Sequence, residues 1–472
     1  MTSPINNRSP IDPTSTEPIY RQIYWRFRRA ITDGVLAPGE RIPAARSLAR
    51  ELGLARGTVD TAYSLLAAEG YIQPRGQAGT VVAAGLNVRP TQAHADHTWP
   101  ATAGVPVRHK APVLPLQMAL PALDEFPRKI WAQIGARCVR ATGVADMASP
   151  SAQGLESLRN AIASYLHVAR GISCQPAQVF VTSGYRNTLT LVARALLQPG
   201  DRVIVENPGY PPTRQLLEAL RIAVQPVGVD QDGLQVSRGI KQFPDTRAAV
   251  VTPAHQSPLC MSLSLPRRLE LLAWAAREQA WVIEDDYDGE YRYVSRPLPA
   301  LKSLDRDSRV LYAGTFSKVL FPGIRIAYLV VPPSLVNRFH TVAETFFGGV
   351  PELTQAIVST FITEGHFARH IQHMRKLYGE RRVAAIKGLS RVLGEHARID
   401  VQPGGMHLIL RLAGAQCDRE LVERLLNAGI YAEALSACYI GPESQCGLML
   451  GFANIDSQAS AERLGKRILA LL

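Results

Sequence analysis

The 472-residue sequence lacks the features that place a chain in a membrane or outside the cell. It has no run of about eighteen apolar residues, and its polar opening, MTSPINNRSPIDPTSTEP, contains no hydrophobic stretch typical of a secretory signal. Its six cysteines are scattered, without CxxC pairs or metal-ligand spacing. These absences favour free thiols in a reducing compartment, so we expect a cytoplasmic protein with no membrane partner and no metal.

Apolar and charged residues make up 46% and 19% of the chain, the proportions of folded, soluble domains. The length exceeds one ordinary core, which predicts two or three folded units. A net charge of +12 suggests a polyanionic partner. Residues 1–85 hold ten arginines and seven acidic residues, so the surplus charge does not by itself mark a DNA-binding segment there.

The first eighty residues predict three short helices and a hairpin. Ile19, Ile23, Phe27 and Ile31 recur at four-residue steps, the spacing of an amphipathic helix. A second helix is indicated in ERIPAARSLARELGL, a third in LARGTVDTAYSLLAAEGYI, and a hairpin with a glycine-rich tip in YIQPRGQAGTVVA. This pattern is typical of a winged helix-turn-helix, although small three-helix units also serve as packing or protein-interaction modules.

The motifs PIYRQI, GVLAPGERIPAARSLARELGLARGTVDTAYSLLAAEGYI and GQAGTVV closely resemble the GntR family of winged helices over residues 18–82. The resemblance implies double-stranded DNA as partner, with the third helix in the major groove. By position it assigns DNA contacts to Arg46 at the start of the second helix, Arg56 and Thr58 at the start of the third, and Arg75 and Gly76 in the wing. Ordinary surface charge is the alternative for the two helical arginines.

A proline-rich stretch without apolar periodicity predicts an extended linker over residues 84–113, between a DNA-binding domain at 1–83 and a large domain at 114–472. In the large domain, β-branched runs such as QVFVTSG, DRVIVENPGY and AWVIEDDYD alternate with amphipathic stretches. This alternation predicts an α/β fold around a mixed, mostly parallel sheet. Ligands of such folds bind at the carboxyl ends of the strands.

Chemically distinctive residues follow three of the predicted strands. EDDYD follows WVI, Thr315, Ser317 and Lys318 follow RVLYAG, and TSG opens a helix after VFV. Hydroxyl groups at a helix N-terminus favour phosphate. A lysine beside a phosphate cradle and a carboxylate has the groups that form a Schiff base with pyridoxal phosphate. A solvated loop lysine and an exposed acidic turn are the ordinary alternative.

Together the stretches ENPGYPPTR, TPAHQSP, WVIEDDYDGEYRY, PLPALKSLD, LYAGTFSKVLFPGIRIAYLV and LGFAN resemble fold-type I aminotransferases over about residues 114–472. Joined to a GntR winged helix, they resemble the MocR/GabR subfamily of bacterial transcription regulators, which includes vitamin B6 regulators of the PdxR type. The resemblance implies a regulator rather than an enzyme, pyridoxal 5'-phosphate as cofactor and a head-to-tail homodimer.

By position, the resemblance makes Lys318 the lysine that forms an aldimine with the cofactor, Asp285 the partner of the pyridine nitrogen and Tyr287 the donor to the ring hydroxyl. It assigns the phosphate to Arg325, Thr315, Ser317, Gly184 and Tyr185, and the ring pocket to His255, Gln256 and Tyr210.

The sequence departs from amino-acid-processing relatives where they bind the substrate carboxylate. Those relatives carry an arginine three residues before the phenylalanine of a strand like RLGFA, whereas GLMLGFAN has Met449 there. Leu259 and Cys260 also replace a small residue and a glycine, and Tyr185 and Arg186 stand where relatives favour small or amide residues.

Three functions fit these residues. In a regulator, pyridoxal phosphate itself could be the signal. An amine or amino acid that forms an external aldimine, recognised through Arg214 or Arg186, could be the effector instead, as in GABA or taurine catabolism. The chain could also be an active aminotransferase with a vestigial winged helix, but Met449 and the intact GntR pattern argue against this.

Overall fold

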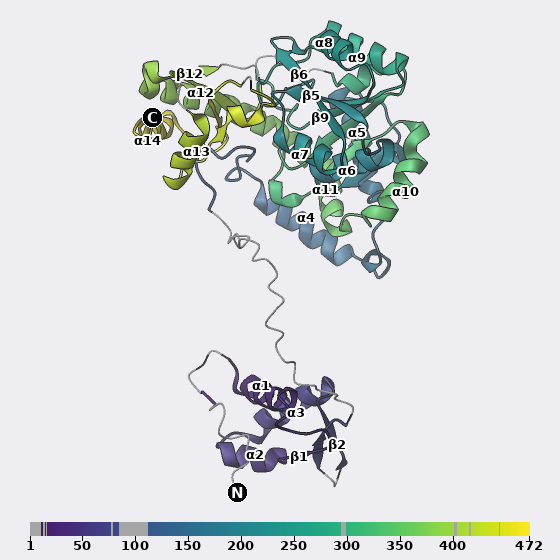
Figure 1. Cartoon of the computed structure of the whole chain (residues 1–472), viewed down its shortest axis with the longest axis vertical. Helices are drawn as coiled ribbons and strands as arrows, with labels where there is room; N and C mark the ends of the chain where they lie inside the picture. The colour runs from purple at the N-terminus through teal and green to yellow at the C-terminus, as the bar shows by residue number, and fades with distance from the viewer. Residues whose placement is uncertain are drawn as a thin grey trace. The chain divides into compact units, whose positions relative to one another are not determined.

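The computed structural model describes residues 11–12, 15, 17–76, 79–84, 112–293, 299–400, 404–414, 417–442 and 444–472. The chain divides into two compact units, residues 1–110 and 111–472, which Figure 1 colours from purple to yellow along the chain. Only the two ends of the predicted linker belong to the described residues. Within those residues, every helix is too short or too polar to cross a membrane.

The N-terminal unit combines three helices with a small antiparallel sheet (Figure 1). The helices are α1 (Ile19–Thr32), α2 (Ala45–Leu52) and α3 (Arg56–Ala68), and the strands, in the order β1-β3-β2, are β1 (Arg41–Ile42), β2 (Ile72–Pro74) and β3 (Thr80–Val82). The predicted stripe forms its core, since Ile23 and Phe27 of α1 are buried with Val59 and Leu66 of α3. Gly53 ends α2 at φ 69°, a conformation that favours glycine and lets the chain turn into α3.

The large unit is built on an eight-stranded mixed sheet. Its strands are β4 (Val179–Thr182), β5 (Arg202–Asn207), β6 (Ala223–Asp230), β7 (Gly233–Leu234), β8 (Thr246–Val251), β9 (Trp281–Asp286), β10 (Val310–Thr315) and β11 (Ala327–Val330). They lie in the order β4-β11-β10-β9-β8-β5-β6-β7. The five strands β10, β9, β8, β5 and β6 are parallel neighbours, whereas β11 and β7 run antiparallel. The predicted mixed, mostly parallel sheet is confirmed.

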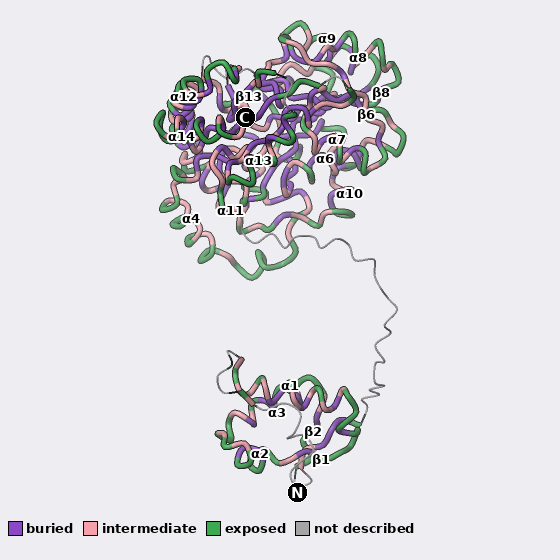
Figure 2. The backbone as a smooth tube through the Cα atoms, turned by 60° about the vertical axis from the view of Figure 1, so that its left-hand side comes forward, coloured by how far each residue is buried: buried purple, intermediate pink, exposed green. Residues whose placement is uncertain are grey.

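Helices cover both faces of this sheet. One face carries α5 (Glu156–Arg170), α8 (Val236–Gln242) and α9 (Leu265–Arg277), and the other α6 (Tyr185–Leu196), α7 (Pro211–Ala219) and α10 (Val336–Phe346). Successive side chains of a strand therefore enter different cores: on β9, Val282 packs with Trp274 of α9, and Ile283 packs with Leu189 of α6. Figure 2 shows the sheet as buried tube inside helices whose outer faces are exposed.

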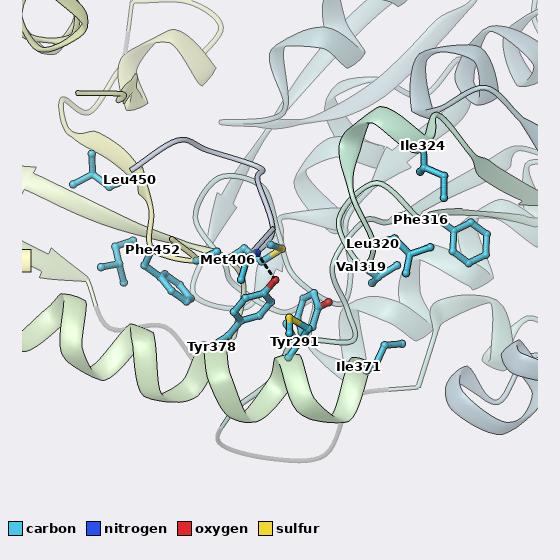
Figure 3. Packing of buried hydrophobic residues seen from close by; sticks show 14 of the residues in the cluster. Tyr291, Phe316, Val319, Leu320, Ile324, Ile371, Tyr378, Met406, Leu450 and Phe452 are labelled. Carbon is cyan, nitrogen blue, oxygen red and sulfur yellow. Dashed lines mark hydrogen bonds between the residues drawn. The ribbon is translucent and has the colours of Figure 1, made fainter. Parts of the chain in front are cut away.

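A smaller C-terminal layer completes the unit. It comprises the antiparallel strands β12 (Ala397–Asp400), β13 (His407–Leu412), β14 (Glu433–Ala434) and β15 (Leu448–Gly451), with α13 (Asp418–Asn427) and α14 (Gln458–Leu469). Helices α4 (Arg128–Ala141), α11 (Glu352–Thr363) and the long α12 (His366–Leu393) join it to the main sheet. Figure 3 shows Ile371 and Tyr378 of α12 pointing into the shared core, where the Tyr378 hydroxyl accepts a hydrogen bond from the Ala122 amide at 3.0 Å.

Candidate functional site

The predicted cofactor residues gather at the carboxyl edge of the main sheet. Thr315 at the end of β10 and Thr182 at the end of β4 both lie level with Ala327 of β11. Asp285 pairs with Ala313 on the neighbouring strand, so it stands at the same edge. Lys318 follows β10 by three residues. The strand order thus brings together side chains that are far apart in the sequence.

Strand alternation divides the acidic cluster into two functions. Asp286 is buried in an ion pair with Arg170 and accepts a hydrogen bond from the Tyr312 hydroxyl at 2.6 Å. Glu284 accepts backbone amides of residues 301 and 302 at 2.8 Å. Both carboxylates therefore stabilise the fold by binding neighbouring segments to β9. Asp285 points to the opposite face, where it lines a pocket.

This pocket lies between the sheet edge and α7. Asp285 lines it together with Tyr185 and Tyr210, whose ring centroids are 5.9 Å apart. Glu206 and Arg214 also line it, and the sequence prediction of cofactor residues missed Glu206. Burial raises the pKa of Glu206 to about 7. The only sequence signal for this carboxylate was its position at the end of a predicted strand.

The buried surroundings of the site shift the pKa of Asp285 upward and the pKa of Lys318 downward. Burial raises the pKa of Asp285 well above its ordinary value, and the neighbouring carboxylates of Asp286 and Glu206 raise it further. Burial lowers the pKa of Lys318, against the opposing charges of Asp288, Glu433 and Asp285. Lys318 Nζ donates to the Ala119 carbonyl at 3.4 Å. A lysine with a lowered pKa is a better nucleophile at neutral pH.

A small concave cradle forms at the N-terminus of α6. Gly184 precedes the helix at φ 115°, and a Cβ placed there would stand 3.1 Å from the Arg325 guanidinium. The cradle therefore requires a residue without a side chain. Beside the same sheet edge, the Thr315 hydroxyl accepts the Ser317 amide at 3.1 Å. A helix N-terminus, an arginine and hydroxyls together fit a phosphate group.

His255 contacts both the predicted residue Tyr287 and the buried carboxylate of Asp288. Its Nδ1 lies 3.0 Å from both the Tyr287 hydroxyl and Asp288 Oδ1. Gln256 is almost fully buried, and its amide donates to the Pro208 carbonyl at 2.8 Å. Gln256 therefore supports the loop that follows β5.

The departures from the family pattern have separate surroundings. Cys260 adopts φ 64°, and its Sγ lies 3.3 Å from His407 Nε2, a neighbour that the sequence did not indicate. Met449 is 3% exposed and packs in an apolar cluster with Leu259, Ile409, Leu435 and Cys438. The position of the missing arginine is thus filled by hydrocarbon and sulfur.

The predicted DNA residues lie on exposed parts of the N-terminal unit. Arg46 and Arg56 are exposed in the first turns of α2 and α3, and Thr58 is half-buried in the first turn of α3. Arg56 Nε lies 3.2 Å from Asp60 Oδ2, and both side chains remain largely in solvent. Both helix starts therefore present a cation to the outside.

In the wing, Arg41 lies close to the segment that contains the predicted residues Arg75 and Gly76. The Arg75 amide donates to the Gly79 carbonyl at 2.7 Å, and Gly76 adopts φ 55° at the turn. The Arg41 side chain lies against Gly79 because β1 pairs with β3 in the register Arg41↔Val81. Arg41 was missed because strand β1 is only two residues long and has no sequence signature.

The fold and these sites define a class of protein, a DNA-binding winged helix joined to an aminotransferase-like domain. Residues 19–82 match the gntR family of bacterial regulatory proteins, and residues 126–459 match aminotransferase class I and II. The second match spans most of the chain. The aminotransferase fold implies pyridoxal phosphate as cofactor, and the gntR helix-turn-helix implies DNA binding.

Whole-length relatives narrow the class. The chain is 34% identical to the probable rhizopine catabolism regulatory protein MocR of Rhizobium meliloti, over 98% of this chain and 95% of that protein. It is 34% identical to the pyridoxine biosynthesis transcriptional regulator PdxR of Corynebacterium glutamicum, over 95% of this chain and 94% of that one. A kynurenine aminotransferase structure from Pyrococcus horikoshii superimposes with a TM-score of 0.69 at 26% identity, covering 77% of this chain and 92% of the other. The chain belongs to the MocR-type GntR regulators and is a transcription regulator.

Proposed function

We propose that this regulator holds pyridoxal phosphate covalently on Lys318 and that the cofactor itself is the signal that changes DNA binding. When bound, pyridoxal phosphate supplies an aldehyde that condenses with amines and a ring that withdraws electrons. Arg325 and the amide end of α6 at Gly184 would hold its phosphate. Asp285 would face the pyridine nitrogen, and a proton there would satisfy this buried carboxylate.

Tyr287 would form a hydrogen bond with the ring hydroxyl of the cofactor, and His255 would form one with Tyr287. The Tyr287 hydroxyl can donate to the ring oxygen while it contacts His255 Nδ1 at 3.0 Å. Tyr210 and Tyr185, which line the pocket with Asp285, would exclude water from the ring. Because burial lowers the pKa of Lys318, its amine loses its proton more readily than that of an exposed lysine, which favours attack on the aldehyde.

The apolar surroundings of Met449 favour the cofactor over an amino acid as the signal. A substrate carboxylate in that place would be desolvated without a positive partner, which is strongly unfavourable. Amino acids bound in the ordinary manner of aminotransferases therefore have no clamp. A signal that needs only the phosphate cradle, Lys318 and Asp285 fits the residues present.

A second effector class is favoured by one observation. Arg214 lines the pocket beside Tyr210, and its only hydrogen bond within the described residues is a long one, 3.5 Å, to the Tyr439 carbonyl. An acidic amine could bind this guanidinium while its amino group reaches the cofactor. For either effector we propose a head-to-tail homodimer, which presents two winged helices to two half-sites.

The covalent link is tested with purified protein and pyridoxal phosphate. Wild-type protein should show the absorbance of lysine-bound cofactor, and borohydride reduction should fix the cofactor mass on the peptide that contains Lys318. Lys318→Ala should lose both signals, while Lys241→Ala, at an exposed lysine of α8, should keep them. Retention of both signals in Lys318→Ala would move the link to another residue.

A further inference from the structure

The positive charge of the large unit is concentrated on one helix. Residues 114–472 contain 39 basic and 32 acidic residues, a net charge of +7. Helix α12 alone has seven basic residues and a single acidic one, a net charge of +6. The rest of the large unit is therefore almost neutral, and most of its surplus positive charge lies on α12.

Two of the seven basic side chains on α12 are buried in the large unit. Arg381 is buried, pairs with Asp124 and donates to the Ala453 carbonyl at 2.5 Å. Arg382 is buried with its guanidinium 5.6 Å from the Tyr293 ring centre. Of the five others, Arg369, Lys376, Lys387 and Arg391 are exposed on the outer side of α12, and Arg375 is half-buried.

A surface groove of about 750 Å³ runs along this outer side of α12. Arg375, Lys376 and Lys387 line it from the helix, Arg292 lines it from the segment after β9, and Glu380 is its one acidic lining residue among those described. Within the described residues, no carboxylate lies at ion-pair distance from either lysine ammonium. Arg375 donates to the Glu290 carbonyl at 3.0 Å, so the two lysines are the groups that gain most from a bound anion.

The spacing of the cations fits an extended polyanion. Lys376 and Lys387 are three helical turns apart, about 16 Å at 1.5 Å per residue. The phosphates of one DNA strand advance about 3.4 Å along the duplex axis per nucleotide, so such a span follows four or five of them. A small anion would contact only one end of the groove.

We infer that the groove of α12 binds the phosphate backbone of DNA, outside the base pairs read by the winged helix. The large unit then contributes sequence-independent affinity to a regulator whose own N-terminal unit carries little surplus charge. This contact does not require the cofactor, so it stands or fails separately from the role of Lys318.

The test compares two full-length variants with equal changes of charge. Lys376→Glu with Lys387→Glu reverses the groove, and Lys129→Glu with Lys241→Glu reverses two exposed lysines on α4 and α8. Affinity for a labelled fragment from upstream of the protein's own gene is measured across a salt series. The groove variant should bind about tenfold more weakly, and its slope of log affinity against log salt should fall by about 2, or about 0.9 for each lost phosphate contact.

A milder pair, Lys376→Gln with Lys387→Gln, guards against misfolding and should give the same direction with a smaller effect. Melting curves that match wild type establish that each variant is folded. If the groove and control variants lose equal affinity with equal salt slopes, the charge acts only at long range and the inference is wrong. Unchanged DNA binding by a folded groove variant would likewise overturn it and leave the groove to an acidic protein or lipid surface.

Discussion

The chain holds one arginine–aspartate pair in solvent and another in its interior. Arg56 and Asp60, at the start of α3, have side chains 68% and 48% exposed. Arg170 and Asp286, on the face of the sheet opposite the pocket that Asp285 lines, are 1% and 2% exposed. The exposed pair is easily broken, which leaves Arg56 available to DNA. The buried pair fixes the end of β9 and so positions the neighbouring Asp285. We therefore propose that the same pair of residue types serves DNA recognition at Arg56 and stabilises the fold at Arg170.

Breaking the buried pair should have the largest effect. Arg170→Ala leaves the Asp286 carboxylate buried without its cation, which should destabilise the large unit by about 3–5 kcal/mol. Urea unfolding followed by a large-unit signal measures this loss. A change below about 1 kcal/mol would mean that the pair is not what holds β9.

Breaking the exposed pair should affect DNA binding instead of folding. Arg56→Ala should weaken operator binding by about 1–3 kcal/mol if the guanidinium reads a guanine. Its unfolding free energy should change by no more than about 0.5 kcal/mol. Arg29→Ala, an exposed arginine of α1, is the matched control and should bind as wild type. An effect confined to the salt slope would reassign Arg56 to a phosphate contact.

The smallest effect concerns the buried thiol of Cys260. Burial alone would raise the pKa of this thiol, but the His407 and His255 imidazoles lower it to about 6 from an ordinary value of 9.0. The Cys260 thiolate in turn helps to raise the pKa values of both imidazoles, so the proton that the folded thiol releases is offset by protons that the folded histidines retain, and stability should not rise with pH between 6 and 9. Ultraviolet thiolate absorbance of the folded protein, followed from pH 4 to 9, should show a thiol that titrates near pH 6 in wild type and is absent from Cys260→Ser. Equal profiles in the two proteins would mean that the Cys260 thiol does not titrate in this pH range.

Much of the fold was predictable because its signals are local. The stripe through Ile23 and Phe27 and the alternation of β-branched runs with helices follow from periodicity, and the structure confirms both fold types. The division of labour within EDDYD was not predictable, because it depends on the partner that each carboxylate meets. Arg170 is more than a hundred residues from Asp286 in the sequence.

The same limit applies to the residues that the sequence analysis missed. Glu206, Arg41 and His407 reach their sites through strand pairing or through contacts between distant segments, which no local pattern records. Met449 was recognised by its departure from a motif, but its apolar surroundings come from β13, the loop after β8 and the segment after β14. The environment of Met449 is therefore a property of the tertiary structure.

The most direct test of the proposed function titrates pyridoxal phosphate into apo-protein bound to a labelled DNA fragment from upstream of its gene, followed by fluorescence anisotropy. We predict that affinity or stoichiometry changes with the cofactor alone, that Lys241→Ala responds as wild type does, and that Lys318→Ala does not respond. Identical DNA binding by wild type with and without pyridoxal phosphate would contradict the proposal and leave the cofactor as a receptor for another amine.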